Sequence, residues 1–272
     1  MKRTKILAAA FSVAVVSALA LMATSSVAAG SLPTLRLALT KNTITIGGSK
    51  VSGAVDVVTT VKGEPFDSPT LIRLMPGVTP KQFGKLVSKL GDQPLDAIDP
   101  YATIEFDGAT DPAGTTSAQA LLPPGHYVAV NDGNGFTPFT IASSAHPASL
   151  PHPSATVTAI DFAYRGADTL RDGELVRFEN DGYLIHMVSW ASTASVADAS
   201  AAEADLLKGD VAGAKTYATG KGQFAGPLST GAMQQQVITE PPGVYVIFCA
   251  MNSQDGRDHY QLGMFRTIQI VK

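Results

Sequence analysis

Cysteine is almost absent from this chain, because its 272 residues include only Cys249. A single thiol cannot form a disulfide within the chain, so it must pair with another molecule, react, sit inertly in the core or bind a metal. Tryptophan also occurs once, and there are five histidines. The sequence therefore offers few candidates for a metal ligand or a catalytic base.

Clusters of positive charge are also missing. The formal net charge is −3, and Lys2, Arg3 and Lys5 stand together at the start, so the rest of the chain is more acidic than this total. A mildly acidic protein without a basic cluster is poorly suited to nucleic acid or to an anionic membrane surface. The sequence predicts no nucleic-acid partner.

The first 29 residues have the pattern of a secretory signal peptide. The three basic residues precede an apolar run over 6–23, and small residues follow as far as Ala29. The alternative is an uncleaved anchor helix, because the run is about long enough to span a bilayer. The small residues favour cleavage, so we expect residues 1–29 to be removed. The mature protein would be secreted or periplasmic, with no further membrane span.

Most of the remaining chain predicts an all-β fold. Short runs of β-branched residues alternate with Gly, Pro, Asn and Asp, as is typical of sandwiches. The predicted strands cover 35–39, 43–46, 54–61, 118–122, 127–130, 157–162, 174–179, 186–190, 235–239, 244–249 and 265–271. Residues 79–90 and 195–208 instead predict short helices, because each begins with a good N-cap residue and continues with apolar residues at helical spacing. Gly-Asp follows each segment and indicates a helix end.

Several similarities between the two parts of the chain indicate an internal duplication. Pro-Pro-Gly-His-Tyr-Val at 123–128 matches Pro-Pro-Gly-Val-Tyr-Val 118 positions later, at 241–246. The Pro-, Ser- and Ala-rich stretch 143–154 has the composition of a linker. We expect two β-sandwich domains in tandem, 33–142 and 155–272, each with a short helix insertion. The alternative is one irregular β domain with chance similarity.

The C-terminal part combines residues that suit copper. Cys249, His259 and Met264 bring a thiol, an imidazole and a thioether to one strand–loop–strand, and His186 lies on a separate predicted strand. Such soft ligands favour copper in a trigonal site with a weak axial thioether. The spacing Asn-x-Gly-x-x-x-His, beginning at Asn180, followed by Cys-x9-His-x4-Met, resembles the cupredoxin (type 1 blue copper) family.

This resemblance implies Greek-key sandwich domains and one type 1 copper ion in the second of them. His186, Cys249 and His259 would form the trigonal plane, and Met264 would be the distant axial ligand. Asn180 would tie the ligand loops together by hydrogen bonds. His259 would be the exposed ligand and the exit for an electron. The partner would be a redox protein, or a donor or acceptor of copper.

The first copy lacks these ligands. At the offset of 118 Asn131 aligns with Cys249, and at an offset of 120 Phe66 stands in the place of His186. No histidine or methionine follows Asn131 before Phe139. We therefore expect the first domain to bind no copper, and to serve in packing, in partner docking or as a cover over the metal edge of its neighbour.

An enzyme is not expected. Multicopper oxidases pass electrons through histidines beside the cysteine to a second copper centre, whereas Phe248 and Ala250 flank Cys249 here and no His-x-His occurs. The preferred function is single-electron transfer or copper carriage. One alternative is a metal-free cell-surface or structural module with a vestigial site. Another is nucleophilic catalysis by Cys249, which needs a neighbouring base and an open pocket.

Overall fold

The computed structural model describes residues 31–272 apart from 41, 63–67, 91–92, 109–113 and 132–134. The predicted signal peptide over 1–29 and the aligned Phe66 both lie outside the described residues. We refer to residues 31–142 as the N-terminal half and to residues 155–272 as the C-terminal half.

Two sheets enclose an apolar core in the N-terminal half. Alternating Leu35, Leu37 and Leu39 are buried while the residues between them are exposed, as a strand with one solvated face requires. Their side chains meet those of the opposite sheet, including Leu71 and Tyr127. One sheet contains β2 (Thr43–Gly48), β1 (Thr34–Thr40), β3 (Gly53–Val61) and β6 (Thr115–Leu122). The other contains β5 (Ala102–Asp107), β4 (Thr70–Leu74), β7 (Gly125–Val130) and β8 (Phe136–Ile141).

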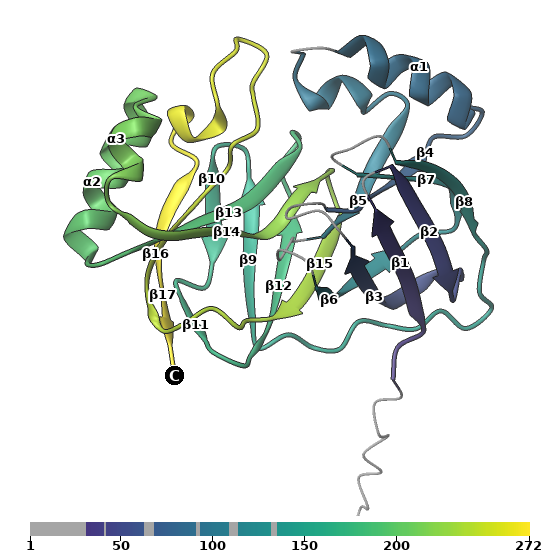
Figure 1. Cartoon of the computed structure of the whole chain (residues 1–272), viewed down its shortest axis with the longest axis horizontal. Helices are drawn as coiled ribbons and strands as arrows, with labels where there is room; N and C mark the ends of the chain where they lie inside the picture. Colours follow the sequence, from purple (N-terminus) through teal and green to yellow (C-terminus); the bar gives the residue numbers. More distant parts are fainter. Residues whose placement is uncertain (1–30, 41, 63–67, 91–92, 109–113, 132–134) are drawn as a thin grey trace, which may run out of the picture. The chain divides into compact units, whose positions relative to one another are not determined.

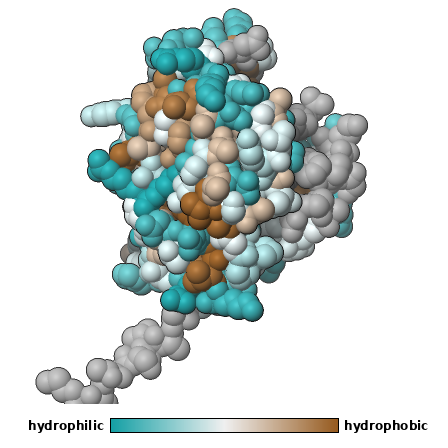
Figure 2. Space-filling view, turned by 90° about the vertical axis from the view of Figure 1, so that its left-hand side faces the viewer, coloured by the Kyte–Doolittle hydropathy of each residue, from teal (hydrophilic) through white to brown (hydrophobic). Residues whose placement is uncertain are grey.

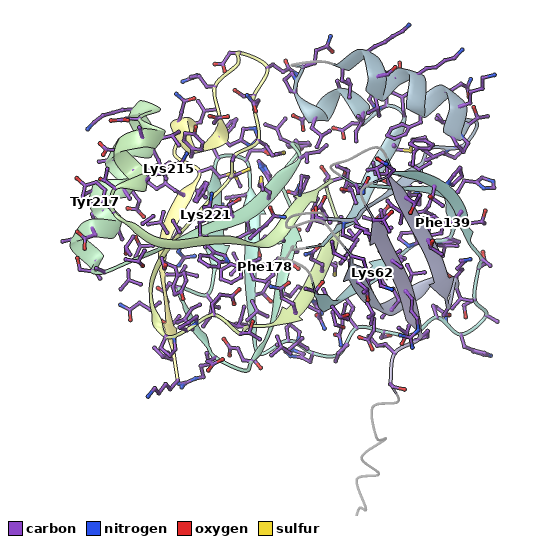
Figure 3. The ribbon with its side chains drawn as sticks, viewed as in Figure 1. Lys62, Phe139, Phe178, Lys215, Tyr217 and Lys221 are labelled. Carbon is purple, nitrogen blue, oxygen red and sulfur yellow. The ribbon has the colours of Figure 1, made fainter. Side chains whose placement is uncertain are left out.

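The C-terminal half repeats this arrangement. Phe178 lies in its interior (Figure 3) and stacks on Phe224 of the opposite sheet, with ring centroids 5.3 Å apart. One sheet contains β10 (Ala163–Gly166), β9 (Ala155–Ile160), β12 (Leu175–Asn180) and β15 (Met233–Val237). The other contains β11 (Thr169–Arg171), β17 (Phe265–Val271), β16 (Gly243–Phe248), β13 (His186–Thr193) and β14 (Ala218–Leu228).

The two halves share one sheet. Strands β6 and β15 pair antiparallel, with Gln234 opposite Ala120, and this joins the strands in the order β10-β9-β12-β15-β6-β3-β1-β2 (Figure 1). The order is symmetric about that pair: β3 runs parallel to β1 and β12 runs parallel to β9. The fold is therefore all-β, with tandem cupredoxin-like sandwiches as expected. The domain boundaries 33–142 and 155–272 stay a prediction.

A hydrogen bond also occurs in both copies of the Pro-Pro-Gly-x-Tyr segment. The hydroxyl of Tyr127 donates to the carbonyl of Pro123 at 2.8 Å, and that of Tyr245 donates to the carbonyl of Pro241 at 2.6 Å. Each tyrosine ring therefore fixes the chain four residues before it. This shared detail supports the proposed duplication.

Each half carries a helix at the same place in its topology. Helix α1 (Pro80–Leu90) connects β4 to β5, and α2 (Val196–Lys208) lies between β13 and β14, followed by α3 (Val211–Lys215). Ser195 accepts a hydrogen bond from the backbone of Asp198 and caps α2, which ends at Gly209 in the left-handed conformation. Both predicted helices are confirmed. Two 3-10 turns, η1 (Leu95–Ile98) and η2 (His259–Leu262), complete the described helical elements.

The face that carries α2 shows hydrophobic residues scattered among hydrophilic ones (Figure 2). Val196 and Leu207 of α2 are among the exposed hydrophobic side chains. Within the described ranges, no helix combines the length and the apolar composition needed to cross a membrane.

Candidate metal centre

The four predicted ligands lie at the ends of four different strands and turns. His186 is the first residue of β13, and Cys249 directly follows β16. His259 begins η2, and Met264 directly precedes β17. All four are buried, with no more than 1% of any of them exposed. The C-terminal sheet thus holds each candidate ligand where a strand or turn meets a loop.

Three donor atoms converge on one point. The Nδ1 atoms of His186 and His259 lie 3.2 Å apart, and the Sγ atom of Cys249 lies 3.8 Å from the first and 3.4 Å from the second. A point equidistant from all three is about 2 Å from each, close to the length of metal–nitrogen and metal–sulfur bonds in protein sites. The cluster of His186, Cys249 and His259, with Met264 beside it, fits one type 1 copper ion.

Asp161 fixes the tautomer of His186. Its Oδ1 atom lies 3.0 Å from Nε2 of His186, and a carboxylate can only accept, so the proton is on Nε2 and the Nδ1 lone pair is free. Burial alone would raise the pKa of Asp161, but hydrogen bonds from the Leu184 amide, His186 and the Tyr183 amide lower it overall. Burial lowers the pKa of His186 and Asp161 only partly offsets this, so the imidazole is kept neutral, as a metal ligand must be.

Cys249 is a protonated thiol in the absence of a cation. Burial raises its pKa to about 12, partly offset by hydrogen bonds from the backbone amides of Met187 and Met251. The Met187 amide lies 3.5 Å from the sulfur. The backbone amide of Cys249 donates to the carbonyl of Met264, and its carbonyl accepts from the amide of Tyr260. The sulfur is thus held in place on both sides of the loop, and metal binding would release its proton.

A capping box positions His259. Asp258 accepts a hydrogen bond from the backbone of Gln261, whose side chain accepts from the Asp258 amide at 2.9 Å. Gly263 then ends the turn in the left-handed conformation, at φ 97°. Asp-x-x-Gln followed by Gly is a readable signature of this turn in the sequence, although the prediction of His259 as a ligand did not depend on it.

The prediction that His259 is the exposed ligand is wrong, because its exposure is 0%. The ring of Phe162 meets it edge-on, with centroids 5.3 Å apart. Phe162 has φ 62°, the only positive value found among the described residues other than glycine, so its backbone takes a disfavoured conformation to place that ring. Burial, and next the nearby His186, lower the pKa of His259 to about 4. Its Nε2 has no hydrogen-bond partner within the described part of the chain.

Asn180 has a narrower role than the resemblance implied. Its side chain donates to the carbonyls of Leu184 and Leu228, each at 2.8 Å, and accepts from the Gly182 amide. It therefore ties the loop before His186 to the end of β14. None of its hydrogen bonds within the described residues reaches the loop from Cys249 to Met264.

The N-terminal half covers residues that adjoin the ligands. Asp96 in η1 accepts a hydrogen bond of 2.6 Å from the amide of Ile185, next to His186. Ile185 also packs in an apolar cluster with Phe83 of α1 and Ile98 of η1, and Met251 packs against the same cluster. These contacts support the expectation that the N-terminal half covers the metal edge of its neighbour. No sequence signal identified Asp96, Asp161 or Phe162, because each acts through tertiary contacts.

Comparisons with known proteins find copper proteins among the solved structures. No protein-family model and no curated protein match the sequence. Among solved structures, auracyanin from Roseiflexus castenholzii has a TM-score of 0.28 and 17% identity, covering 43% of this chain and 95% of that chain. An azurin from Methylomonas sp. strain J has a TM-score of 0.26 and 18% identity, covering 43% and 96%.

A longer similar structure is the copper nitrite reductase from Nitrosomonas europaea, with a TM-score of 0.24 and 11% identity over 88% of this chain and 93% of that chain. This chain resembles the cupredoxins in its sandwich fold and in its His-Cys-His-Met set. The function inferred for it rests on its own strand order and ligand geometry.

Proposed function

We propose that this protein is an exported copper protein that transfers single electrons through one type 1 copper ion bound by His186, Cys249, His259 and Met264. The observation that carries the proposal is the convergence of two imidazole nitrogens and one thiol, 3.2 to 3.8 Å apart, in a buried site. Copper bound there would supply a couple between the cupric and cuprous states. A redox protein would be the partner, and the predicted signal peptide would direct export.

The surrounding residues favour electron transfer over copper carriage. A protein that carries copper must pass the ion to an acceptor, which requires at least one accessible ligand. Here the three converging residues are buried, and Asp161, the capping box of η2 and the backbone amide at the sulfur hold them in place. A rigid site of this kind suits a metal that stays bound while its charge changes.

The same burial argues against an enzyme. A metal that converts a substrate keeps an open coordination position, whereas the side chains around this centre leave His186, Cys249 and His259 with at most 1% exposure. The cluster is also the one group of three or more candidate metal ligands found in the described part of the chain. We therefore propose a carrier of electrons with no substrate chemistry of its own.

Reversible reduction under chelator challenge separates electron transfer from carriage. The mature chain is loaded with one equivalent of copper, reduced, incubated with a cuprous chelator, and reoxidised. Electron transfer requires the metal to remain bound and the visible absorption of the copper–thiolate bond to return in full. Loss of the copper to the chelator on reduction would support carriage instead.

A further inference from the structure

With His259 buried, an electron needs another route to the surface. The three converging ligands are at most 1% exposed, and so is Met264. Phe162 packs against the imidazole of His259. The inference below rests on the proposed electron-transfer function. The route that it identifies begins at the imidazole of His186.

A single hydrogen bond connects His186 to a partly exposed residue. Its Nε2 lies 3.0 Å from Oδ1 of Asp161, and 30% of the Asp161 side chain is exposed. The same oxygen accepts hydrogen bonds from the backbone amides of Tyr183, at 2.9 Å, and Leu184, at 3.1 Å. The imidazole is thereby joined to the loop 181–184 through one carboxylate oxygen.

The loop also packs directly against the imidazole. A Cβ atom at Gly182 would lie 2.8 Å from Nε2 of His186 and 2.6 Å from Oδ1 of Asp161, so only glycine allows this approach. Thr230 donates to the carbonyl of Gly182 at 2.8 Å, and Asn180 accepts from its amide. The loop is held from several sides, so its position relative to His186 is fixed.

Tyr183 projects from this loop. It is 85% exposed, the highest value among the exposed large hydrophobic side chains of the described residues. Its near neighbour Asp181 is exposed, and Asp161 supplies a second carboxylate beneath the loop. An aromatic ring next to two carboxylates suits a partner that combines an apolar contact with positive charge.

We propose that electrons enter and leave through the Tyr183 surface, formed by Asp161, Asp181, Gly182 and Tyr183, and that the partner there is a redox protein with a positively charged docking face. The path runs from His186 through its hydrogen bond to Asp161 and through the packed backbone at Gly182. Phe162 closes the alternative edge at His259.

The first test measures reduction of the copper-loaded protein by hexaammineruthenium(II). One electron passes from the ruthenium complex, which becomes ruthenium(III), to the cupric site, which becomes cuprous, and no atom or proton is transferred. In Tyr183→Lys the added positive charge should slow this reaction roughly threefold at low ionic strength, through repulsion of a dication near 10 Å. The matched control is Tyr101→Lys in the N-terminal half, where the tyrosine is 43% exposed.

The control should react at the wild-type rate, and both variants should keep the wild-type visible spectrum. Equal rates for Tyr183→Lys and Tyr101→Lys would overturn the proposed surface while leaving the copper site intact. A protein that acquires no colour with copper would overturn the proposed function, and this proposal with it.

A second readout needs no copper. Hexaamminechromium(III), a paramagnetic trication, is added to the metal-free protein and the broadening of backbone amide resonances is measured. We expect selective broadening over 181–184 that Tyr183→Lys reduces and Tyr101→Lys does not. Broadening centred on 259–262, with none at the loop, would contradict the proposal.

Discussion

Asp161 shows how one carboxylate prepares a metal ligand. It fixes the proton of His186 on Nε2, so Nδ1 faces Cys249 and His259 as an acceptor. The substitution Asp161→Ala removes this acceptor and should weaken copper binding by about 10- to 100-fold, the usual cost of losing a hydrogen bond that orients a ligand. Competition with a chelator of known affinity would measure this.

Asp181→Ala is the matched control, because Asp181 is the first residue of the loop 181–184 and is exposed to solvent. Its copper affinity should equal that of the wild type. An Asp161→Ala protein that binds copper as tightly as this control would show that the hydrogen bond does not orient His186.

Asp99, which directly follows η1, should make stability depend on pH. Burial, and next the nearby Asp96, raise its pKa from 3.8 to about 6. The folded protein therefore binds a proton at the Asp99 carboxyl more tightly than the unfolded chain does. The contribution of Asp99 to stability falls as pH rises from 3.8 to about 6. Asp99→Asn should therefore be more stable than the wild type at pH 7, and its advantage should shrink towards pH 4.

Urea denaturation of both proteins at several pH values would measure the difference in free energy of unfolding. A difference that is the same at pH 4 and pH 7 would contradict the raised pKa.

At the residue scale the members of the cluster could be predicted because the sequence offers so few alternatives. One cysteine and five histidines leave little choice once the spacing is recognised. Asp161 and Phe162 could not be found in this way, since aspartate and phenylalanine are common and their roles depend on strands that meet only in the folded chain. The exposure of His259 was predicted wrongly for the same reason, because burial depends on tertiary contacts.

At the scale of elements, η2 is the support of His259. Replacing Asp258 with alanine removes its side chain from the capping box, which should cost about 1 kcal/mol of stability. Because His259 is the first residue of this turn, copper affinity should fall as well. Chelator competition and urea denaturation on the same sample would give both quantities.

Thr79→Ala provides the control from the N-terminal half. Thr79 and Gln82 form the equivalent reciprocal pair at the start of α1, where the Gln82 amide donates to the hydroxyl at 3.2 Å and the Thr79 amide donates to the Gln82 side chain at 2.9 Å. Loss of the Thr79 hydroxyl should lower stability by a similar amount and leave copper affinity unchanged. Equal losses of copper affinity in both variants would show that general destabilisation, and not the position of η2, is responsible.

Helix α2 has a structural role at the same turn. Ala199, Ala202 and Leu206 form an apolar cluster with Tyr260 of η2 and Val246 of β16. Helix α2 therefore packs against β16, which precedes Cys249, and against η2, which begins at His259. Its existence could be predicted from apolar spacing and caps, but the surface it contacts could not.

Strand β14, which the sequence did not predict, has a weak local signal. It contains three glycines, a lysine and a proline, residues that are depleted in sheets. Strands β4 and β5 were also missed, although their sequences favour strands. Strand β14 nevertheless pairs with β13 over most of its length, with register shifts that absorb the irregular positions. Tertiary pairing here outweighs local propensity.

At the scale of the whole molecule, the shared sheet and the contacts beside the metal centre should make the two halves unfold together. The pairing of β6 with β15 and the hydrogen bond from Ile185 to Asp96 both cross between them. The only tryptophan, Trp190, reports on the C-terminal half. Its fluorescence and the far-ultraviolet circular dichroism of the whole chain should therefore give the same urea midpoint.

Two steps in the circular dichroism, with only one matched by fluorescence, would show that the halves are independent. The N-terminal half would then be a separate domain and not a structural cover for the metal edge.

Copper titration of the purified mature protein tests the central claim most directly. We predict intense visible absorption that saturates at one copper(II) per chain. Cys249→Ala should abolish the colour, while His126→Ala, which alters an exposed histidine of β7, should retain it. A wild-type protein that stays colourless with copper, and whose thiol is fully titratable after denaturation, would contradict the account.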